Sequence, residues 1–177
     1  MSETEIIKNC VPEDIPEYVI KTSAAGCCRW LVPCGAAEKD GKLVLCPDTD
    51  GLIPLAGTVT EDKSKAMSLA FSIGSALIKV CEAAARCNDW FIPDKYLDLS
   101  MNGLFYDPVS GCVKILPGIC GTGESFGRRI CRLAEELAAD TAREEGGHLV
   151  KRLCESGASR SDDKKLISRH ITQILLK

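Results

Sequence analysis

The residues best suited to chemistry lie in a glycine-rich segment, 118–127, between a predicted strand and a predicted helix. Gly121 and Gly123 would let backbone amides approach a phosphate, and the positive end of the following helix would favour its charge. Glu124 stands where phosphate-binding loops of this kind carry a lysine, and its carboxylate would repel the same phosphate. The alternative is a glycine-rich connector that leads into the helix and is capped by Thr122 or Ser125.

Three arginines follow on the first turns of that helix, at positions 128, 129 and 132. All three, with Arg128 and Arg129 as the main candidates, could receive a phosphate or an acidic peptide, because a guanidinium group binds such anions through paired hydrogen bonds. The alternative is a solvated helix face on which these arginines pair with Glu135 and Glu136. The sequence leaves both interpretations open.

The cysteines could indicate metal binding, disulfides or neither. There are eleven, at positions 10, 27, 28, 34, 46, 81, 87, 112, 120, 131 and 154. No two are spaced as Cys-x-x-Cys, and neither His148 nor His170 lies beside a cysteine pair. Structural zinc sites usually take two ligands from one tight turn, so we expect no metal and no other cofactor. Buried, reduced thiols in a reducing cytosol are the favoured interpretation, with metal or disulfide as the alternative.

Length and composition indicate one globular domain of 177 residues, 45% hydrophobic and 27% charged. The formal net charge of −3 gives no general attraction to nucleic acid or anionic lipid. No apolar run approaches the roughly 20 residues that a membrane-spanning helix needs. Met1–Cys10 has neither a basic start nor the apolar core of a signal peptide. We therefore expect a cytoplasmic protein that binds no nucleic acid and is not inserted in a membrane, with residues 1–14 disordered.

The pattern predicts an α+β fold with a small β-rich lobe over residues 15–60. Asp40–Gly41 is a strong signal for a tight hairpin turn, and Ile53–Leu55 is compatible with a short edge strand. Together these signals predict a small antiparallel sheet. Three further segments are predicted strands: Tyr18–Ile20, Cys28–Val32 and Lys42–Cys46.

Residues 61–177 are predicted to form a mainly helical lobe. Apolar residues recur at helical spacing from Asp62 to Asn88, and Trp30 and Trp90 are expected to anchor the core or the lobe interface, with partner binding as the alternative. A hairpin is predicted from Leu104–Asp107 and Cys112–Leu116, in which Val113 and Ile115 should face the core.

Three helices are predicted after the hairpin. The first runs from Phe126 to Gly146–Gly147, and a short one covers Leu149–Cys154. The last begins near Ser161 and is predicted to bury Leu166, Ile167, His170, Ile171, Ile174 and Leu175.

The order long helix, loop, tight hairpin, helix resembles the centre of a protein-kinase C-lobe, over roughly residues 66–140. Tyr96–Leu99 stands where kinases carry His-Arg-Asp-Leu. Leu104–Asp107 resembles the strand after the catalytic asparagine, and Val113–Leu116 the strand before Asp-Phe-Gly. Through Phe105–Pro108 and Ile115–Pro117 the chain also resembles an uncharacterised bacterial domain, often found N-terminal to forkhead-associated domains in Gram-positive anaerobes.

The resemblance would make Asp98 the base that accepts a substrate proton, but the other catalytic groups are missing. The metal-binding asparagine position is Gly103, with Asn102 one residue early. Leu116–Gly118 replaces Asp-Phe-Gly, and no Gly-x-Gly-x-x-Gly loop or clear strand lysine precedes the long helix. Without these groups the charge of a transferred phosphoryl group is not stabilised. The alternative role for Asp98 is structural, as a loop acid that caps backbone amides.

The resemblance therefore implies a degenerate, pseudokinase-like domain of reduced kinase architecture that is not an enzyme. We expect it to bind a protein partner that the sequence does not identify, as an adaptor in bacterial signalling or secretion. The alternative, from another class, is a nucleotide- or phosphate-binding domain that uses Gly118–Gly127.

Overall fold

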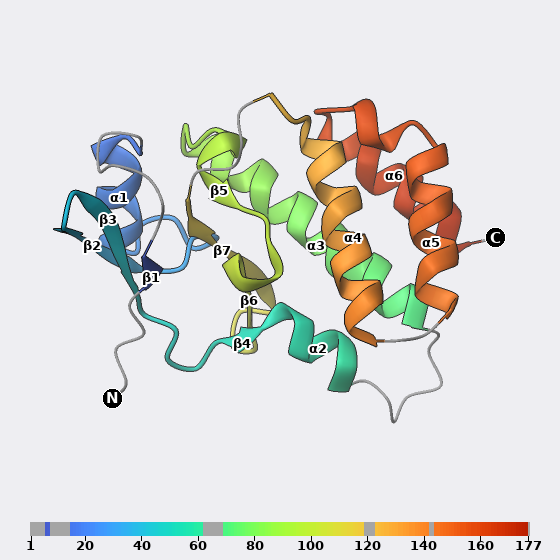
Figure 1. Ribbon diagram of the computed structural model, residues 1–177, viewed down its shortest axis with the longest axis horizontal. Coiled ribbons are helices and arrows are strands. Elements are labelled where there is room, and N and C mark those ends of the chain that lie inside the picture. Colours follow the sequence, from blue (N-terminus) through green and yellow to red (C-terminus); the bar gives the residue numbers. More distant parts are fainter. Residues whose placement is uncertain (1–5, 8–14, 62–68, 119–122, 142–143, 177) are drawn as a thin grey trace.

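The computed structural model describes residues 6–7, 15–61, 69–118, 123–141 and 144–176. Over these ranges the chain is an α+β protein, as predicted, with two antiparallel sheets and a group of helices. Figure 1 shows the N-terminal sheet at one end, the helices at the other and the second sheet between them. The hydrophobic core is continuous from Ile15 to Ile171 in the last helix. None of the helices in the described ranges is both long and apolar enough to span a lipid bilayer.

The N-terminal sheet has the strand order β1-β3-β2, and helix α1 packs against it. The predicted turn at Asp40–Gly41 joins β2 to β3, and its two residues have positive φ values of 53° and 72°. Such values match a two-residue hairpin turn, and the prediction is confirmed. The elements of this unit are β1 (Ile6–Ile7), α1 (Glu17–Ala24), β2 (Cys34–Lys39) and β3 (Lys42–Pro47).

The prediction of a strand at Tyr18–Ile20 is wrong, because this segment lies in helix α1. Glu17 and Lys21 form an ion pair one helical turn apart at 2.8 Å, and Val19 is buried against the core. A three-residue apolar run fits a helix or a strand equally well, so packing decides between them.

The prediction of a strand at Cys28–Val32 is also wrong. The segment is a turn with one parallel bridge, between Leu31 and Ile115. The amide of Val32 donates to the carbonyl of Ile115 at 3.0 Å, so this turn ties the N-terminal unit to the second sheet. Strand β2, which follows it, was not predicted, because its exposed Gly-Ala-Ala-Glu-Lys sequence lacks an apolar alternation.

The second sheet has the strand order β4-β6-β7-β5, with all neighbours antiparallel. The predicted hairpin is confirmed, as is the edge strand at Ile53. The carboxylate of Asp107 accepts hydrogen bonds from the amides of Val109 and Ser110 across the turn, and the Ser110 hydroxyl lowers the pKa of Asp107. The strands are β4 (Ile53–Pro54), β5 (Leu97–Asp98), β6 (Leu104–Asp107) and β7 (Cys112–Pro117).

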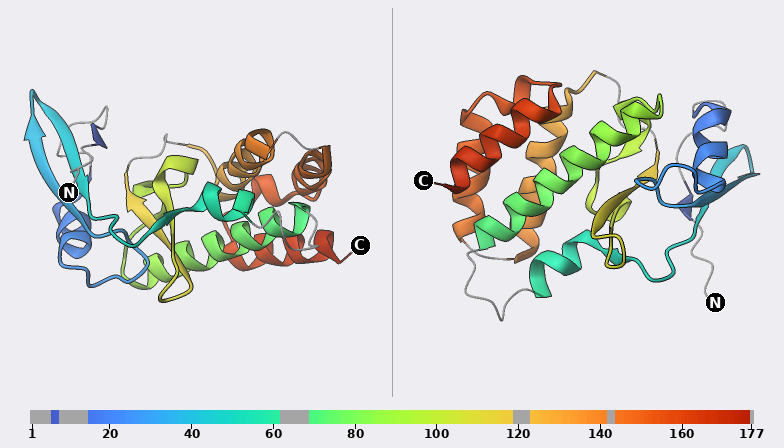
Figure 2. Two further views of the ribbon diagram at one scale, coloured as in Figure 1. Left: turned by 90° about the horizontal axis from the view of Figure 1, so that it is seen from below. Right: turned by 180° about the vertical axis from the view of Figure 1, so that it is seen from behind.

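The helical part is built around α3, which packs along β7 on one side and along α6 on another. The two views of Figure 2 show α3 and α6 side by side. Gly74 of α3 allows this close approach, because a β-carbon there would lie 2.7 Å from the side chain of Leu175. The helices are α2 (Leu55–Glu61), α3 (Leu69–Asp89), α4 (Phe126–Thr141), α5 (Glu144–Glu155) and α6 (Lys164–Leu175), with short 3-10 turns η3 (Asp94–Tyr96), η4 (Met101–Gly103) and η5 (Ala158–Arg160).

Two features of the helices differ from the prediction, and one predicted boundary is not tested. Within the described residues helix α3 spans Leu69–Asp89, and its predicted start near Asp62 lies outside them. Helix α2 was not predicted. Gly146–Gly147 does not end a helix but lies within α5, because the apolar face of α5 packs on α4 and stabilises helical glycine.

The predicted start of the last helix is confirmed, since Asp163 caps α6 by accepting hydrogen bonds from the amides of Lys165 and Leu166. The prediction that Leu166 is buried is wrong: it is 41% exposed. On the predicted apolar face Ile167 and Ile171 are buried, while His170 is half-buried.

The register of the hairpin matches the prediction that Val113 and Ile115 face the core, since their exposed fractions are 1% and 0%. Lys114 lies on the other face, where its ammonium group is 3.7 Å from Asp107 and its side chain is only 17% exposed. The aliphatic part of Lys114 therefore covers that face of the hairpin.

We predict that Val113→Asp lowers the free energy of unfolding by about 3–5 kcal/mol, because it buries an uncompensated carboxylate. Lys114→Met keeps the packing and loses one weak ion pair, so it should cost less than about 1 kcal/mol. Urea denaturation followed by circular dichroism measures both values. Equal losses for the two variants would show that the hairpin register is wrong.

Candidate functional site

The start of helix α4, the candidate phosphate site, has its first amides already paired. The amide of Phe126 donates to a carboxylate oxygen of Asp162 at 2.7 Å. The next amide donates to the carbonyl of Ser161 at 2.8 Å, and the third to the hydroxyl of Ser125 at 3.2 Å. A phosphate would have to displace these partners and would meet the negative charge of Asp162. This geometry is that of a capped connector and weighs against phosphate binding at this end.

Two glycines of this segment have structural roles. A β-carbon on Gly127 would overlap the carbonyl oxygen of Ala158, so a glycine is needed for α4 to approach η5. Gly123 is exposed and has a φ of +94°, a turn conformation that favours glycine. Gly121 lies outside the described residues. Glu124 forms an ion pair with Arg132 at 2.9 Å.

Asp98, the candidate base, takes part in the structure of its own loop. Its carboxylate accepts hydrogen bonds from the amide and the hydroxyl of Ser100, at 3.0 and 2.7 Å. A β-carbon on Gly103 would lie 2.6 Å from the carboxyl carbon of Asp98, so that position must be glycine for the loop to close. Asn102 is exposed on η4. These contacts are those of a loop acid.

Leu116–Gly118, which stands where kinases carry the magnesium-binding Asp-Phe-Gly, is part of the apolar core. Leu116 and Pro117 pair with β5, and Leu116, Pro117 and Gly118 are all buried. Within the described ranges, no three side chains of His, Cys, Asp or Glu are grouped so that they could hold a metal ion.

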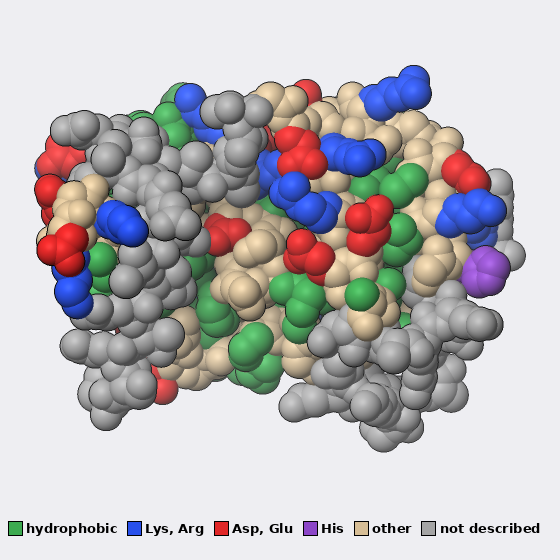
Figure 3. Space-filling model, viewed as in Figure 1, with side chains coloured by type: hydrophobic (Ala, Val, Ile, Leu, Met, Phe, Trp, Pro, Cys, Tyr) green, Lys and Arg blue, Asp and Glu red, His purple; other side chains and the backbone are tan. Residues whose placement is uncertain are grey.

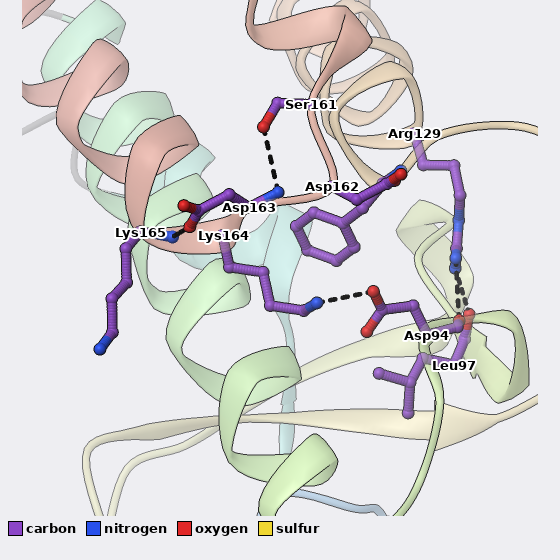
Figure 4. A network of polar contacts seen from close by, with 9 residues as sticks. Asp94, Leu97, Arg129, Ser161, Asp162, Asp163, Lys164 and Lys165 are labelled. Atoms are coloured by element: carbon purple, nitrogen blue, oxygen red, sulfur yellow. Dashed lines mark hydrogen bonds and ion pairs between the residues drawn. The ribbon is translucent and has the colours of Figure 1, made fainter.

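The two arginines predicted as a binding pair lie on different faces of α4. Arg128 is exposed. Arg129 is 3% exposed, and its guanidinium group donates to the backbone carbonyls of Asp94 and Leu97, as Figure 4 shows. Arg129 therefore holds the loop that leads to Asp98 and is not available to a ligand at the surface.

A polar network joins this loop to the starts of α4 and α6 (Figure 4). The ammonium group of Lys164 lies 2.6 Å from the carboxylate of Asp94 and 4.6 Å from the centre of the Phe126 ring. The side-chain amide of Asn88, with its nitrogen toward the acceptors, donates to Asp94 and accepts from Lys164 at 3.0 Å. A hollow of about 260 Å³ beside this network is lined by three carboxylates and by the cationic side chains of Lys95 and Arg129, so its lining has one more negative than positive group.

The buried cysteines Cys28, Cys87 and Cys131 are not accessible as nucleophiles. Hydrogen bonds from the Cys87 thiol and from the amides of Trp30 and Leu31 lower the pKa of Cys28 to about 7, while the pKa of Cys87 is raised. Both residues are buried, at 1% and 0% exposure. Burial raises the pKa of Cys131 to about 12. All cysteines in the described ranges are free. Five of them are buried, as predicted, whereas Cys27 and Cys46 are exposed.

The sequence did not reveal an exposed aromatic surface at the end of α3. Phe91 is 85% exposed, and Trp90 and Tyr18 are 42% and 44% exposed. Of the two predicted roles of Trp90 as an anchor, the one in the core is therefore wrong. The hydroxyl of Tyr18 donates to the carbonyl of Phe91 at 2.8 Å and fixes that peptide. We call Tyr18, Trp90 and Phe91 the aromatic surface.

Phe91 occupies the position at which helices usually end with glycine. Its φ is +58°, its amide donates to the carbonyl of Asn88, and the amide of Ile92 donates to the carbonyl of Cys87. This is the Schellman arrangement, in which Ile92 and Cys87 meet in the core while the residue between them points outward. The signal in the sequence was the absence of glycine after Asn88-Asp89, at the end of a strongly helical pattern.

No family model matches the chain, and no curated protein matches it significantly. What the molecule can bind is therefore inferred from its own geometry. That geometry engages Asp98, Ser125 and Arg129 in structural contacts and leaves the aromatic surface exposed to solvent.

We predict that Arg129→Met lowers the free energy of unfolding by about 2–4 kcal/mol, because two buried carbonyls lose their donor. Arg128→Met, its neighbour on the exposed face, should stay within about 0.5 kcal/mol of the wild type. Thermal and urea denaturation of the two variants give the comparison. If Arg129→Met is as stable as Arg128→Met, the guanidinium group does not hold the loop.

Proposed function

We propose that this chain is a non-catalytic protein-interaction domain, an adaptor with a reduced kinase-like order of elements. The observation that carries the proposal is Phe91, whose ring is 85% exposed on a backbone with a φ of +58°. A bulky residue in this conformation costs about 1–2 kcal/mol relative to glycine. No burial offsets that cost in the folded chain, so what Phe91 supplies is an aromatic side chain held in solvent.

The neighbours of Phe91 support the same conclusion. Trp90 and Tyr18 expose large aromatic surfaces beside it, and aromatic side chains carry much of the binding energy at protein interfaces. The peptide of Phe91 is held by the helix end on one side and by the Tyr18 hydroxyl on the other. A ring presented from a fixed backbone loses little conformational freedom when a partner binds.

The contacts at the degenerate catalytic positions support the non-catalytic part of the proposal. The order of elements on which the kinase resemblance rests, from α3 through the β6–β7 hairpin to α4, is present in the chain. At the positions that carry chemistry in kinases, Asp98 bonds within its loop and Leu116–Gly118 is buried and apolar. The free cysteines are compatible with a reducing compartment, and we propose that the adaptor acts in the cytoplasm of a bacterium, in signalling or secretion.

We predict that the purified protein does not hydrolyse ATP and that ATP with magnesium leaves its melting temperature unchanged. One group that stabilises charge in a transition state is worth about 3–4 kcal/mol, and the loss of several such groups leaves the rate at background. Phosphate release and thermal-shift assays test both statements. Sustained turnover that Asp98→Ala abolishes would overturn the non-catalytic proposal.

We predict that Phe91→Gly raises the free energy of unfolding by about 1 kcal/mol, because it relieves the positive φ without loss of burial. Phe91→Ala retains the backbone strain and should lie within about 0.5 kcal/mol of the wild type. Urea denaturation gives both values. A destabilised Phe91→Gly variant would mean that the ring contributes to the fold and is not held out for a partner.

Site-specific photocrosslinking tests the interaction itself. A benzophenone side chain at position 91 should give a discrete crosslinked protein in cells, because this position is expected to lie in the interface. The matched control is Val109, which is 95% exposed in the hairpin turn and is not part of the aromatic surface. Crosslinks from position 109 but not from position 91 would contradict the proposed interface.

A further inference from the structure

A groove of about 670 Å³ lies between α3 and α6. The two helices run side by side on the face seen in the right-hand view of Figure 2. Trp30 closes the groove at the end nearest the C-terminus of α3, beside Arg86 and Asp89. The aromatic surface begins at the next residue, Trp90, so the groove and the aromatic surface adjoin along the chain.

The groove is locally basic in a chain whose net charge is −3. Its lining carries four basic side chains and two carboxylates, of Glu82 and Asp89. Arg86 pairs with Asp89 at 3.5 Å and Lys164 pairs with Asp94 at 2.6 Å. The other two cations, Lys165 and Arg169, form no ion pair with any described residue. By contrast, Figure 3 shows acidic and basic side chains intermixed over α4 and α5 on the opposite face.

The floor of the groove is neutral and partly apolar. It contains Cys81 and Ala85, and burial raises the pKa of Cys81 to about 12, so its thiol carries no charge at neutral pH. Trp30 is half-buried, and the guanidinium groups of Arg29 and Arg86 lie 5.0 and 5.9 Å from the centre of its ring. An apolar anchor beside a cationic rim is suited to a ligand that is anionic and also has an apolar side chain.

The spacing of Lys165 and Arg169, which have no ion pair among the described residues, indicates the shape of the ligand. Lys165 and Arg169 are four residues apart on α6, so they lie on one face about 6 Å apart along the axis. Carboxylates two residues apart on an extended peptide are separated by about 7 Å and point the same way. The carboxylates of Glu82 and Asp89, together with the net charge, disfavour a nucleic-acid backbone.

We propose that the groove between α3 and α6 binds an extended acidic peptide segment of a partner protein. Carboxylates at alternate positions pair with Lys165 and Arg169, and an apolar side chain packs against Trp30. The proposal deepens the proposed function, since it names the chemical class of the partner that the interaction domain recognises. Arg86 remains paired with Asp89 and orders the Trp30 end of the groove.

The test uses a fluorescein-labelled peptide, Gly-Leu-Ser-Glu-Ser-Glu-Ser-Glu-Gly, and its counterpart with glutamine in place of glutamate. Fluorescence anisotropy at low salt should give binding of the acidic peptide at least about tenfold tighter than that of the glutamine peptide. Binding should also weaken by about tenfold or more between 50 mM and 500 mM salt, because the exposed charges are then screened. A glutamine peptide that binds equally well would overturn the proposal.

Charge-reversal variants locate the site. Lys165→Glu with Arg169→Glu should weaken binding of the acidic peptide by about tenfold or more. Arg128→Glu with Lys151→Glu makes the same change in net charge at exposed positions on α4 and α5, and it should leave binding unchanged. Equal loss in both double variants would mean that only net charge matters and would refute the groove. Circular dichroism confirms that each variant is folded.

Tryptophan fluorescence provides a second readout. The chain has two tryptophans, so in a Trp90→Phe variant Trp30 is the remaining reporter. The acidic peptide should shift the emission of Trp30 to shorter wavelength, because its leucine covers the ring. An unchanged spectrum at a saturating peptide concentration would exclude Trp30 as the anchor and overturn the proposal.

The failure of this proposal can be separated from the failure of the proposed function. A discrete crosslink from position 91 with no binding of the acidic peptide refutes the groove and leaves the interaction domain in place. Binding of the peptide with no crosslink supports the groove and removes Phe91 as the contact. Tighter binding of a duplex oligonucleotide than of the peptide would overturn the acidic-peptide proposal.

Discussion

The buried guanidinium group of Arg129 is the constraint on which the arrangement of the helical part depends. A charge with 3% exposure is tolerated when it has hydrogen-bond acceptors, and the two terminal nitrogens of Arg129 donate to the backbone carbonyls of Asp94 and Leu97. These two carbonyls can converge on α4 if the chain after α3 turns through η3 into β5. The carboxylate of Asp94 then faces Lys164 at the start of α6. One buried charge thus fixes where three segments meet.

This arrangement explains why the residues that resemble catalytic or phosphate-binding groups make structural contacts instead. Loop 94–103 is held from α4 by Arg129 and again by Glu136, which accepts a hydrogen bond from the amide of Met101 at 3.3 Å. Asp98 sits between these two attachments and bonds to Ser100. The start of α4 is held in turn by Asp162, so the positive end of that helix already meets a carboxylate. In an active site the carboxylate of Asp98 and the amides at the start of α4 would be free to contact a ligand. Here they form hydrogen bonds within the fold.

The sequence allowed the hairpin, its register and the Asp40–Gly41 turn to be predicted, because these depend on short-range alternation and on positive φ at two adjacent residues. The role of Arg129 could not be predicted. The sequence pattern indicates that a charged residue on a helix is exposed, and only the folded structure shows that the carbonyls of Asp94 and Leu97 accept its hydrogen bonds. The need for Gly127 depends on Ala158, thirty-one positions later in the chain. Whether Tyr18–Ile20 forms a helix or a strand likewise depends on tertiary packing, since a short apolar run is compatible with both.

The aromatic surface and the groove are linked through the end of α3. Ile92 and Cys87 are both buried at 0% exposure, and the hydrogen bond between their backbones closes the helix. Because Ile92 must enter the core, the residue before it has to take a left-handed conformation and point away from the core. Asp89, one residue before Trp90, belongs to the groove and pairs there with Arg86. The position of Phe91 relative to the groove is therefore set by the same helix end. A partner that spans both would meet two surfaces already held in place, and its binding would lose less conformational entropy than binding to a flexible loop.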